Sequence, residues 1–386
     1  MIRVLSIFGT RPEAVKMAPV VQQLAACASI ESSVCVTAQH RQMLDQVLDL
    51  FNIHPDFDLN LMQPDQTLAS LTASIFTRLD PVLKEVKPDW VLVQGDTTTV
   101  MAAALLAYYN HIRVGHVEAG LRTGDKWQPF PEEINRRVAG VVADLHFAPT
   151  DLSRQNLLNE GVPSWRIALT GNTVIDALHQ ITKRPSPLEV EQLLERLNIR
   201  PGGRQLVLVT AHRRENFGQP LEDICLGLLR LAQAYPQRLQ LIYPVHLNPN
   251  VQGPVYRLLG DIPNITLLPP LDYLPLVHLL RHTTLVLTDS GGIQEESTGL
   301  GIPTLVLRQT TERPEGVSAG VLKLVGTDPE LIFSESQHLL EDAQAYQTMA
   351  HAENPFGDGH AAEKIIRALL DYQDPPSQYP AGGNNP

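Results

Sequence analysis

The sequence predicts an α/β protein made of two doubly wound, Rossmann-like domains that face one another across a cleft. Short apolar runs alternate with longer amphipathic stretches from end to end, an order typical of parallel sheets with helices on both faces. This order stops after Asp176 and starts again near residue 206. Polar and glycine-rich motifs follow several apolar runs, at the strand ends where doubly wound folds bind ligands.

The apolar runs have the length of buried strands. The strands expected in the first domain are 4–8, 34–37, 90–94, 114–118, 145–148 and 167–170. Those expected in the second domain are 206–210, 239–243, 265–268, 285–288 and 304–307. Amphipathic stretches between the runs predict helices, among them 14–26, 100–109, 221–234 and 292–299.

The domain boundary is expected after Asp176, because the proline-containing segment 183–187 breaks the pattern. The expected domains are residues 1–176 and 177–358. A last helix at about 359–372 has an apolar stripe that needs a partner surface, formed by Ala362, Ile365, Ile366, Leu369 and Leu370. Residues 373–386 are rich in Pro, Gly, Asn and Gln, so a disordered tail is expected.

Length and composition are those of a soluble enzyme. A chain of 386 residues is too long for one ordinary core, and 43% hydrophobic with 19% charged residues is a typical globular balance. The sequence contains no run of about 18 apolar residues, so no membrane span is expected. Its first eight residues resemble a buried strand and are too short for a signal sequence.

Cysteine usage and charge narrow the function further. Cys27, Cys35 and Cys225 are odd in number and lack CxxC spacing, which favours reduced thiols in a cytoplasmic protein over a disulfide framework or a zinc site. The formal net charge of −12 argues against binding to nucleic acid or to an anionic membrane. An acidic protein that binds a diphosphate must gather its cations at one place.

Charged residues follow the apolar runs of the first domain. Arg11 and Lys16 lie on a glycine turn that opens a helix, where backbone N–H groups attract anions; a plain turn with solvated cations is the alternative. Asp96 and Glu118 stand at two further strand ends, although Asp96 is equally consistent with an N-cap. Glu132 opens a helix after a proline loop, a position that also suits the helix dipole.

The second domain repeats this arrangement. His212 and Arg213 follow its first apolar run, and they suit phosphate binding or acid–base chemistry, or else a surface basic turn. Segment 289–296 reads Asp-Ser-Gly-Gly-Ile-Gln-Glu-Glu and opens a helix after another apolar run. Its two glycines let the backbone approach a ligand, so we expect a phosphate cradle there, with Arg313 as a further cation. The segment does not match the Walker A pattern.

These motifs, in this order, resemble the non-hydrolysing UDP-N-acetylglucosamine 2-epimerase family over residues 2–370. Segments 9–13, 95–99, 116–122 and 289–296 match the family pattern without a gap. The resemblance implies a GT-B type fold, a homodimer, and a last helix that packs back on the first domain. The implied reaction interconverts UDP-N-acetylglucosamine and UDP-N-acetylmannosamine by elimination and re-addition of UDP through a 2-acetamidoglucal, for surface polysaccharide synthesis.

The resemblance also implies roles for individual residues. The positions that match catalytic residues are Asp96, Glu118, Glu132 and His212, without distinguishing the acid from the base. The positions that match UDP-binding residues are Arg11, Lys16, Ser290, Gly291, Gly292, Glu296 and Arg313. The positions that match a second, allosteric UDP-N-acetylglucosamine site are Gln39, Gln42, Glu132, Arg213 and His246.

Three departures from the family pattern stand beside these matches. Asp65 occupies a position where some relatives have an activator-site Arg, and a carboxylate there would repel a diphosphate, which weakens the expectation of allosteric activation. Ser297-Thr298-Gly299 replaces the usual Ala-Pro-Ser, and Leu276 replaces an aromatic residue beside the uracil. We therefore expect an altered helix turn and looser packing of the base, with activity retained.

Three alternative functions remain open at this level. A UDP-sugar glycosyltransferase would share the nucleotide site but would have no evident use for Asp96, Glu118 and Glu132. A hydrolysing epimerase would release free N-acetylmannosamine, and a nucleotide-sugar sensor would keep only the phosphate cradle. The sequence has no HExxH, no Cys/His ligand spacing and no GxGxxG with an acid about twenty residues further on. We therefore expect neither a metal nor a nicotinamide cofactor.

Overall fold

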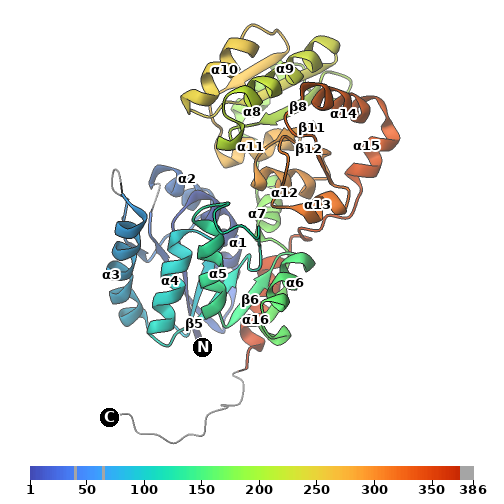
Figure 1. Cartoon of the computed structure of the whole chain (residues 1–386). Helices are drawn as coiled ribbons and strands as arrows, with labels where there is room; N and C mark the ends of the chain where they lie inside the picture. Colours follow the sequence, from blue (N-terminus) through green and yellow to red (C-terminus); the bar gives the residue numbers. More distant parts are fainter. Residues whose placement is uncertain (39–40, 63–65, 374–386) are drawn as a thin grey trace, which may run out of the picture.

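The structure is a computed structural model that describes residues 1–38, 41–62 and 66–373. Two parallel sheets, each with helices on both faces, lie one above the other in Figure 1. The first sheet has the order β3-β2-β1-β4-β5-β6-β7 and the second the order β10-β9-β8-β11-β12-β13. We call the part that carries the first sheet the first half and the part that carries the second sheet the second half. The doubly wound fold class is confirmed.

The strands of the first half are β1 (Ile2–Phe8), β2 (Ile30–Val36), β3 (Phe57–Asp58), β4 (Trp90–Gln94), β5 (Arg113–Val117), β6 (Leu145–Ala148) and β7 (Ile167–Leu169). Those of the second half are β8 (Gln205–Thr210), β9 (Leu239–Pro244), β10 (Ile265–Leu268), β11 (Thr283–Thr288), β12 (Thr304–Val306) and β13 (Leu322–Leu324). The sequence did not predict β3 and β13. Each has two or three residues and pairs at the edge of a sheet, so its apolar signal is too short to stand out.

The helices of the first half are α1 (Arg11–Ala26), α2 (Arg41–Phe51), α3 (Leu68–Val86), α4 (Thr98–Tyr109), α5 (Glu132–Val142), α6 (Asp151–Asn159) and α7 (Thr173–Thr182). Those that follow are α8 (Leu188–Arg196), α9 (Gln219–Ala234), α10 (Pro249–Leu259), α11 (Tyr273–Leu280), α12 (Gly291–Gly299), α13 (Pro314–Ser318), α14 (Pro329–Glu341), α15 (Ala343–Ala350) and α16 (Ala361–Asp371). None of these helices is both long enough and apolar enough to cross a membrane.

Helix α7 joins the two halves. It packs against α1 from the first half and against α11 and α12 from the second, and Figure 1 shows it between the two sheets. The expected domain boundary at residue 176 falls inside this helix, and the domain limits stay a prediction. One continuous apolar core extends from α1 through α7 to Tyr273 and Val277 of α11, so the halves share a packed interface beneath the cleft.

The chain returns to the first half at its end. Helix α16 packs on α1, α7 and β7, and its buried stripe consists of Ala361, Ala362, Ile365, Ile366 and Leu369. The carboxylate of Asp176 accepts hydrogen bonds from the N–H groups of Ala361 and Ala362 at 3.1 and 2.8 Å. These bonds satisfy the donors at the start of α16, so one side chain fixes where the last helix begins.

Truncation of the α16 stripe should destabilise the protein. Ile365 is fully buried, and we expect Ile365→Ala to lower the free energy of unfolding by about 2–5 kcal/mol, because it leaves a cavity between α16 and α1. Urea unfolding followed by circular dichroism measures this change. Leu370→Ala, on the exposed side of the same helix, is the control and should shift stability by less than about 0.5 kcal/mol. Equal losses would contradict the packing described.

Candidate active site

The glycine turn after β1 is held by a buried carboxylate. Thr10 caps α1, and Glu13 accepts hydrogen bonds from the backbone N–H groups of Gly9 and Thr10 at 2.8 and 2.7 Å. Its second oxygen accepts from the hydroxyl of Thr97 at 2.6 Å. A Cβ on Gly9 would lie 1.9 Å from the hydroxyl of Thr37, so only glycine fits this close turn. Glu13 thus ties the end of β1 to the end of β4.

Glu118 is buried directly after β5, where side chains from both halves meet. The backbone of Glu118 adopts the left-handed conformation, with φ of 62°. This conformation costs a non-glycine residue roughly 1–2 kcal/mol and is often found at functional sites. Its carboxylate accepts from the Lys16 ammonium at 2.6 Å, from the Asn172 amide at 2.9 Å and from the Gln94 amide. The strained backbone therefore directs Glu118 into a set of converging donors.

These donors keep Glu118 ionised. Burial opposes its charge, but Lys16 and Arg313 outweigh burial and lower the pKa of Glu118 to about 2. The same pairing acts on the cation: burial disfavours charged Lys16, yet Glu118 and Glu295 raise its pKa above the ordinary value. Both groups are therefore charged at neutral pH, in a buried setting where their attraction is strong.

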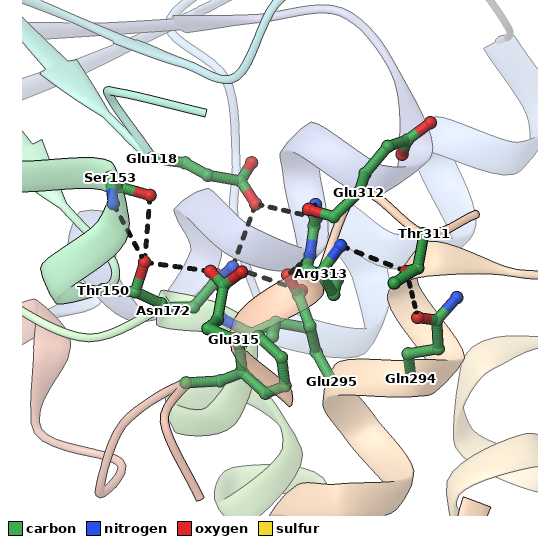
Figure 2. A network of polar contacts seen from close by, with 12 residues as sticks. Glu118, Thr150, Ser153, Asn172, Gln294, Glu295, Thr311, Glu312, Arg313 and Glu315 are labelled. Carbon is green, nitrogen blue, oxygen red and sulfur yellow. Dashed lines mark hydrogen bonds and ion pairs between the residues drawn. The ribbon is translucent and has the colours of Figure 1, made fainter. Parts of the chain in front are cut away.

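A second acid enters the same cluster from the second half (Figure 2). Glu295 of α12 pairs with the guanidinium of Arg313 and accepts from the Asn172 amide at 3.1 Å. Its carboxylate also lies 4.0 Å from the ammonium of Lys16, and Arg313 lies 3.7 Å from Glu118. The two predicted cations, Lys16 and Arg313, are thus each shared between an acid of the first half and an acid of the second.

Asp96 follows β4 and faces Arg136 of α5. The guanidinium and carboxylate are 2.7 Å apart, and the Asn135 amide donates to the backbone carbonyl of Asp96 at 3.0 Å. Burial raises the pKa of Asp96 despite Arg136. The N-cap interpretation of Asp96 is wrong: Thr97 caps α4, and its hydroxyl accepts from the Val100 N–H. The Asp96 side chain is therefore free of a capping role.

Glu132, the first residue of α5, also reaches this region. Its Oε2 is buried and has no hydrogen-bond partner among the residues that the structure describes, and its charge contributes to the raised pKa of Asp96. The neighbouring Glu133 is instead fully buried and bonded to Arg137 and the backbone of Thr123. The structural role at the start of α5 falls to Glu133, which leaves Glu132 available for a ligand.

His212 lies across the cleft, on the loop after β8. Its ring stacks on His246, with centroids 5.3 Å apart, and its Nδ1 lies 4.0 Å from Oδ1 of Asp289. Asp289 is fully buried, and its other oxygen accepts from the backbone N–H groups of His212 and Arg213, both at 2.8 Å, and from the Asn216 amide. Burial lowers the pKa of His212 although Asp289 opposes the shift, so the ring is neutral at neutral pH.

The N-terminus of α12 forms the predicted cradle. Ser290 is its N-cap residue and makes no side-chain capping bond, and a Cβ on Gly292 would meet no atom within 4 Å. The Ser290 N–H donates to the hydroxyl of Thr288 at 3.0 Å, so the N–H groups of Gly291 and Gly292, in the first turn of α12, are the backbone donors left for an anion. The guanidinium of Arg213 approaches Gly291, which brings a predicted allosteric residue beside predicted UDP-binding residues.

Glu296 and Arg11 lie at the side of the cradle. Burial and the charge of Glu295 raise the pKa of Glu296 to about 8, and its carboxyl neighbours the buried hydroxyl of Tyr273. Arg11 of α1 donates to the backbone carbonyl of Leu271 at 3.4 Å, so it spans the two halves. Charged and polar groups from α1, α11 and α12 thus meet at one point.

Some predicted positions lie outside the described residues, and others, in α11 and α12, lie within them. Gln39, Asp65, the side chain of Gln42 and residues 374–386 lie outside the described residues. Ser297 and Thr298 donate their hydroxyls to backbone carbonyls one turn earlier in α12, and the helix ends at Gly299. Leu276 packs, partly buried, against the core of the second half.

The sequence analysis missed four residues that hold this site together: Gln94, Arg136, Asn172 and Asp289. Each donates to or accepts from a predicted residue. Gln94 and Asp289 stand in motifs that the sequence singled out, so their position at strand ends was an available signal. Arg136 lies on the helix that Glu132 was predicted to open, but nothing local indicated its pairing with Asp96, 40 residues away along the chain. Asn172 gave no signal, and its partner Glu118 lies 54 residues away.

Comparisons with known proteins agree with this geometry. The sequence model of the UDP-N-acetylglucosamine 2-epimerase family matches residues 22–370. The UDP-N-acetylglucosamine 2-epimerases of Salmonella typhimurium and Escherichia coli K12 are both 54% identical to the chain. The alignments cover 96% of this chain and 99% of the Salmonella protein, and 95% of this chain and 98% of the E. coli protein.

Two solved structures are similar over most of the chain. The Neisseria meningitidis UDP-GlcNAc 2-epimerase bound to UDP-GlcNAc is 48% identical, with a TM-score of 0.88 over 96% of this chain and 100% of that one. The Methanocaldococcus jannaschii enzyme in complex with UDP-GlcNAc and UDP is 32% identical, with a TM-score of 0.79 over 96% and 99% of the two chains.

Two facing doubly wound sheets, with an acid cluster and an open helix N-terminus between them, define an enzyme of the GT-B type. The comparisons specify which one. The chain belongs to the UDP-N-acetylglucosamine 2-epimerase family, and it is an epimerase rather than a glycosyltransferase or a sensor. The predicted family is therefore confirmed.

A buried histidine beside the site should make stability depend on pH. His116 of β5 bonds to the carbonyl of Gly95 at 2.7 Å, and burial lowers its pKa from 6.5 to about 4. Between these values the unfolded chain binds a proton that the folded chain refuses. The stabilisation is therefore complete above pH 6.5 and is lost as pH falls to 4, by up to roughly 3 kcal/mol.

Urea unfolding between pH 7 and pH 4 measures this contribution. His116→Gln should lose less stability over this interval than the unmodified chain, because the titrating group is gone. His351→Gln, at an exposed position, is the matched control and should follow the unmodified chain. Parallel curves for all three proteins would show that His116 titrates normally.

Proposed function

We propose that this epimerase interconverts UDP-N-acetylglucosamine and UDP-N-acetylmannosamine by elimination and re-addition. A base removes the proton on carbon 2, the bond from carbon 1 to the UDP oxygen breaks, and a 2-acetamidoglucal forms with UDP still bound. An acid then protonates carbon 2 on the other face, and UDP attacks carbon 1. The observation that carries this proposal is the meeting of buried cations with several acids, among them Glu118, whose pKa is lowered, and Asp96, whose pKa is raised.

The acids have environments suited to different tasks. Glu118 is surrounded by donors and stays ionised, so it orients Lys16 and the sugar and offsets charge as the glucal forms. Asp96 has a raised pKa, and Glu132 has a buried oxygen without a partner among the described residues. Asp96 and Glu132 are therefore our candidates for the proton transfers, because neither carboxyl is enclosed by several donors as that of Glu118 is.

The diphosphate would lie between the two halves. Gly291 and Gly292 offer backbone N–H groups, Ser290 offers its hydroxyl, and Arg11, Lys16 and Arg313 offer charge, while Glu296 can accept from the ribose hydroxyls. His212 stands near this cradle as a neutral donor to the leaving phosphate. Holding UDP in place matters for the second step, because re-addition is fast only when the nucleophile stays oriented. The Neisseria and Methanocaldococcus relatives, whose structures contain UDP-GlcNAc, support UDP-N-acetylglucosamine as the ligand.

Further steps of the proposal concern assembly and biological role. We propose a homodimer, which supplies activated N-acetylmannosamine for surface polysaccharide synthesis. Arg213 and His246 are candidates for a second UDP-N-acetylglucosamine site, because His246 stacks on His212 and Arg213 approaches Gly291. A ligand that touched them would be coupled directly to the catalytic loop.

Proton NMR in deuterated water tests the reaction. With UDP-N-acetylglucosamine, a chelator and no added NAD, we expect the manno epimer with deuterium at carbon 2 and UDP still attached, since deprotonation exchanges that hydrogen with solvent. Free N-acetylmannosamine would mean that the glucal is hydrolysed instead. An epimer that keeps its original hydrogen, or activity that depends strictly on metal or NAD, would contradict the elimination mechanism.

Substitution of the two best-defined acids tests their roles. Asp96→Asn should lower kcat by about 10²–10⁴-fold, the range for loss of a positioned acid or base. Glu118→Gln should lower kcat by about 10²–10³-fold, the range for loss of a preorganised electrostatic group. Steady-state kinetics of the purified variants measures this loss. The matched control is Glu330→Gln. Glu330 lies on α14 and forms an exposed ion pair with Arg230 of α9, so this variant should keep the activity of the unmodified enzyme. Full activity in Asp96→Asn would remove Asp96 from the mechanism.

A further inference from the structure

We propose that Asn172 is a positioning residue that holds Glu118 in its reactive orientation and couples it to the second half through Glu295. This inference rests on the proposed role of Glu118. Asn172 itself lies outside the predicted set of catalytic, UDP-binding and allosteric residues. Its place between Glu118 of the first half and Glu295 of the second is visible in Figure 2.

The amide of Asn172 bridges the two acids. Its Nδ2 donates to Oε1 of Glu118 at 2.9 Å and to Oε2 of Glu295 at 3.1 Å. An amide nitrogen has two hydrogens, so it can satisfy one acceptor in each half at the same time. Asn172 is only 3% exposed, and hydrogen bonds to buried carboxylates are among the stronger ones in proteins.

The other polar groups of Asn172 fix the amide in place. Its Oδ1 caps α7 by accepting from the Val174 N–H at 3.1 Å, and its backbone N–H donates to the carbonyl of Phe356 at 2.7 Å. The cap ties the side chain to the helix that joins the two halves, and the backbone bond ties it to the segment leading into α16. The donor group therefore points at the cleft with little rotational freedom.

This arrangement makes Asn172 sensitive to the relative position of the halves. Glu118 is also held by Lys16 and Gln94, both from the first half, and Glu295 is also held by Arg313. If the second half moved away, the bond to Glu295 would break while the bond to Glu118 remained. The bridging amide thus fixes the positions of Glu118 and Glu295 relative to one another when the two halves are arranged as in this structure.

Two variants separate this role from simple capping of α7. Ser and Asp both cap helices as well as Asn does, so Asn172→Ser and Asn172→Asp keep the bond to Val174 and lose the donors to Glu118 and Glu295. We expect Asn172→Ser to lower kcat about tenfold to a hundredfold. Asn172→Asp should lose more, because it adds a third carboxylate to the cluster and favours protonation of Glu118.

A pH profile distinguishes positioning from loss of structure. With its donor removed, Glu118 should take up a proton at higher pH. The acidic limb of kcat/KM and the titration of carbon-13-labelled Glu carboxyls should therefore move toward neutral pH in both variants. Asn264, which is equally buried at 3% and donates its amide to the carbonyls of Ala232 and Leu239, supplies the control. Asn264→Ser should lose stability but keep the kcat and pH profile of the unmodified enzyme.

The outcomes are distinct. A kcat and acidic limb like those of the unmodified enzyme in folded Asn172→Ser or Asn172→Asp would overturn the inference, and so would a lower kcat with an unmoved limb and an unmoved Glu titration. Glu118→Gln, measured in parallel, tests the proposed role of Glu118, on which this inference rests. If Glu118→Gln is fully active, the role of Glu118 fails and this inference fails with it. If Glu118→Gln is inactive while the Asn172 variants are normal, only the inference about Asn172 fails.

Discussion

The site depends on the pairing of two cations with two buried acids across the junction of the sheets. Lys16 and Glu118 come from the first half, and Arg313 and Glu295 from the second. A single buried charge in such a place would be expensive, and removal of one partner would leave the others uncompensated. Longer contacts of 3.7 Å from Arg313 to Glu118 and 4.0 Å from Lys16 to Glu295 join the two pairs, and one apolar core extends from the first half to α11 of the second.

The parallel sheets deliver these groups to one place. Strand ends in a parallel sheet lie along one edge, and Gly9, Asp96 and Glu118 each follow a neighbouring strand of the first sheet. His212 and Asp289 follow two neighbouring strands of the second. A diphosphate between the two edges could reach backbone donors at the start of α12 and charge from both halves. The acids can then take different parts in the reaction because their surroundings differ, although all of them are carboxylic acids.

How far the sequence could lead is clear from particular residues. The strand ends and the α12 start were predictable, because apolar runs and glycine turns are local signals. The short edge strands β3 and β13 were not, because two or three residues carry too little pattern. Asp96 was equally consistent with a cap of α4 and with an active-site role, and only the structure showed that the next residue, Thr97, is the N-cap.

The sequence by itself determined the fold class, the family and the positions of the acids and cations, since each depends on local pattern or on residue identity at motif positions. Tertiary structure alone decided which of these groups touch. It paired Lys16 with Glu118, gave the structural role at α5 to Glu133, and placed the Asn172 amide between acids from both sheets. Charge states in the cleft follow from those contacts, because burial and neighbouring charges set a pKa and neither can be read along one chain segment.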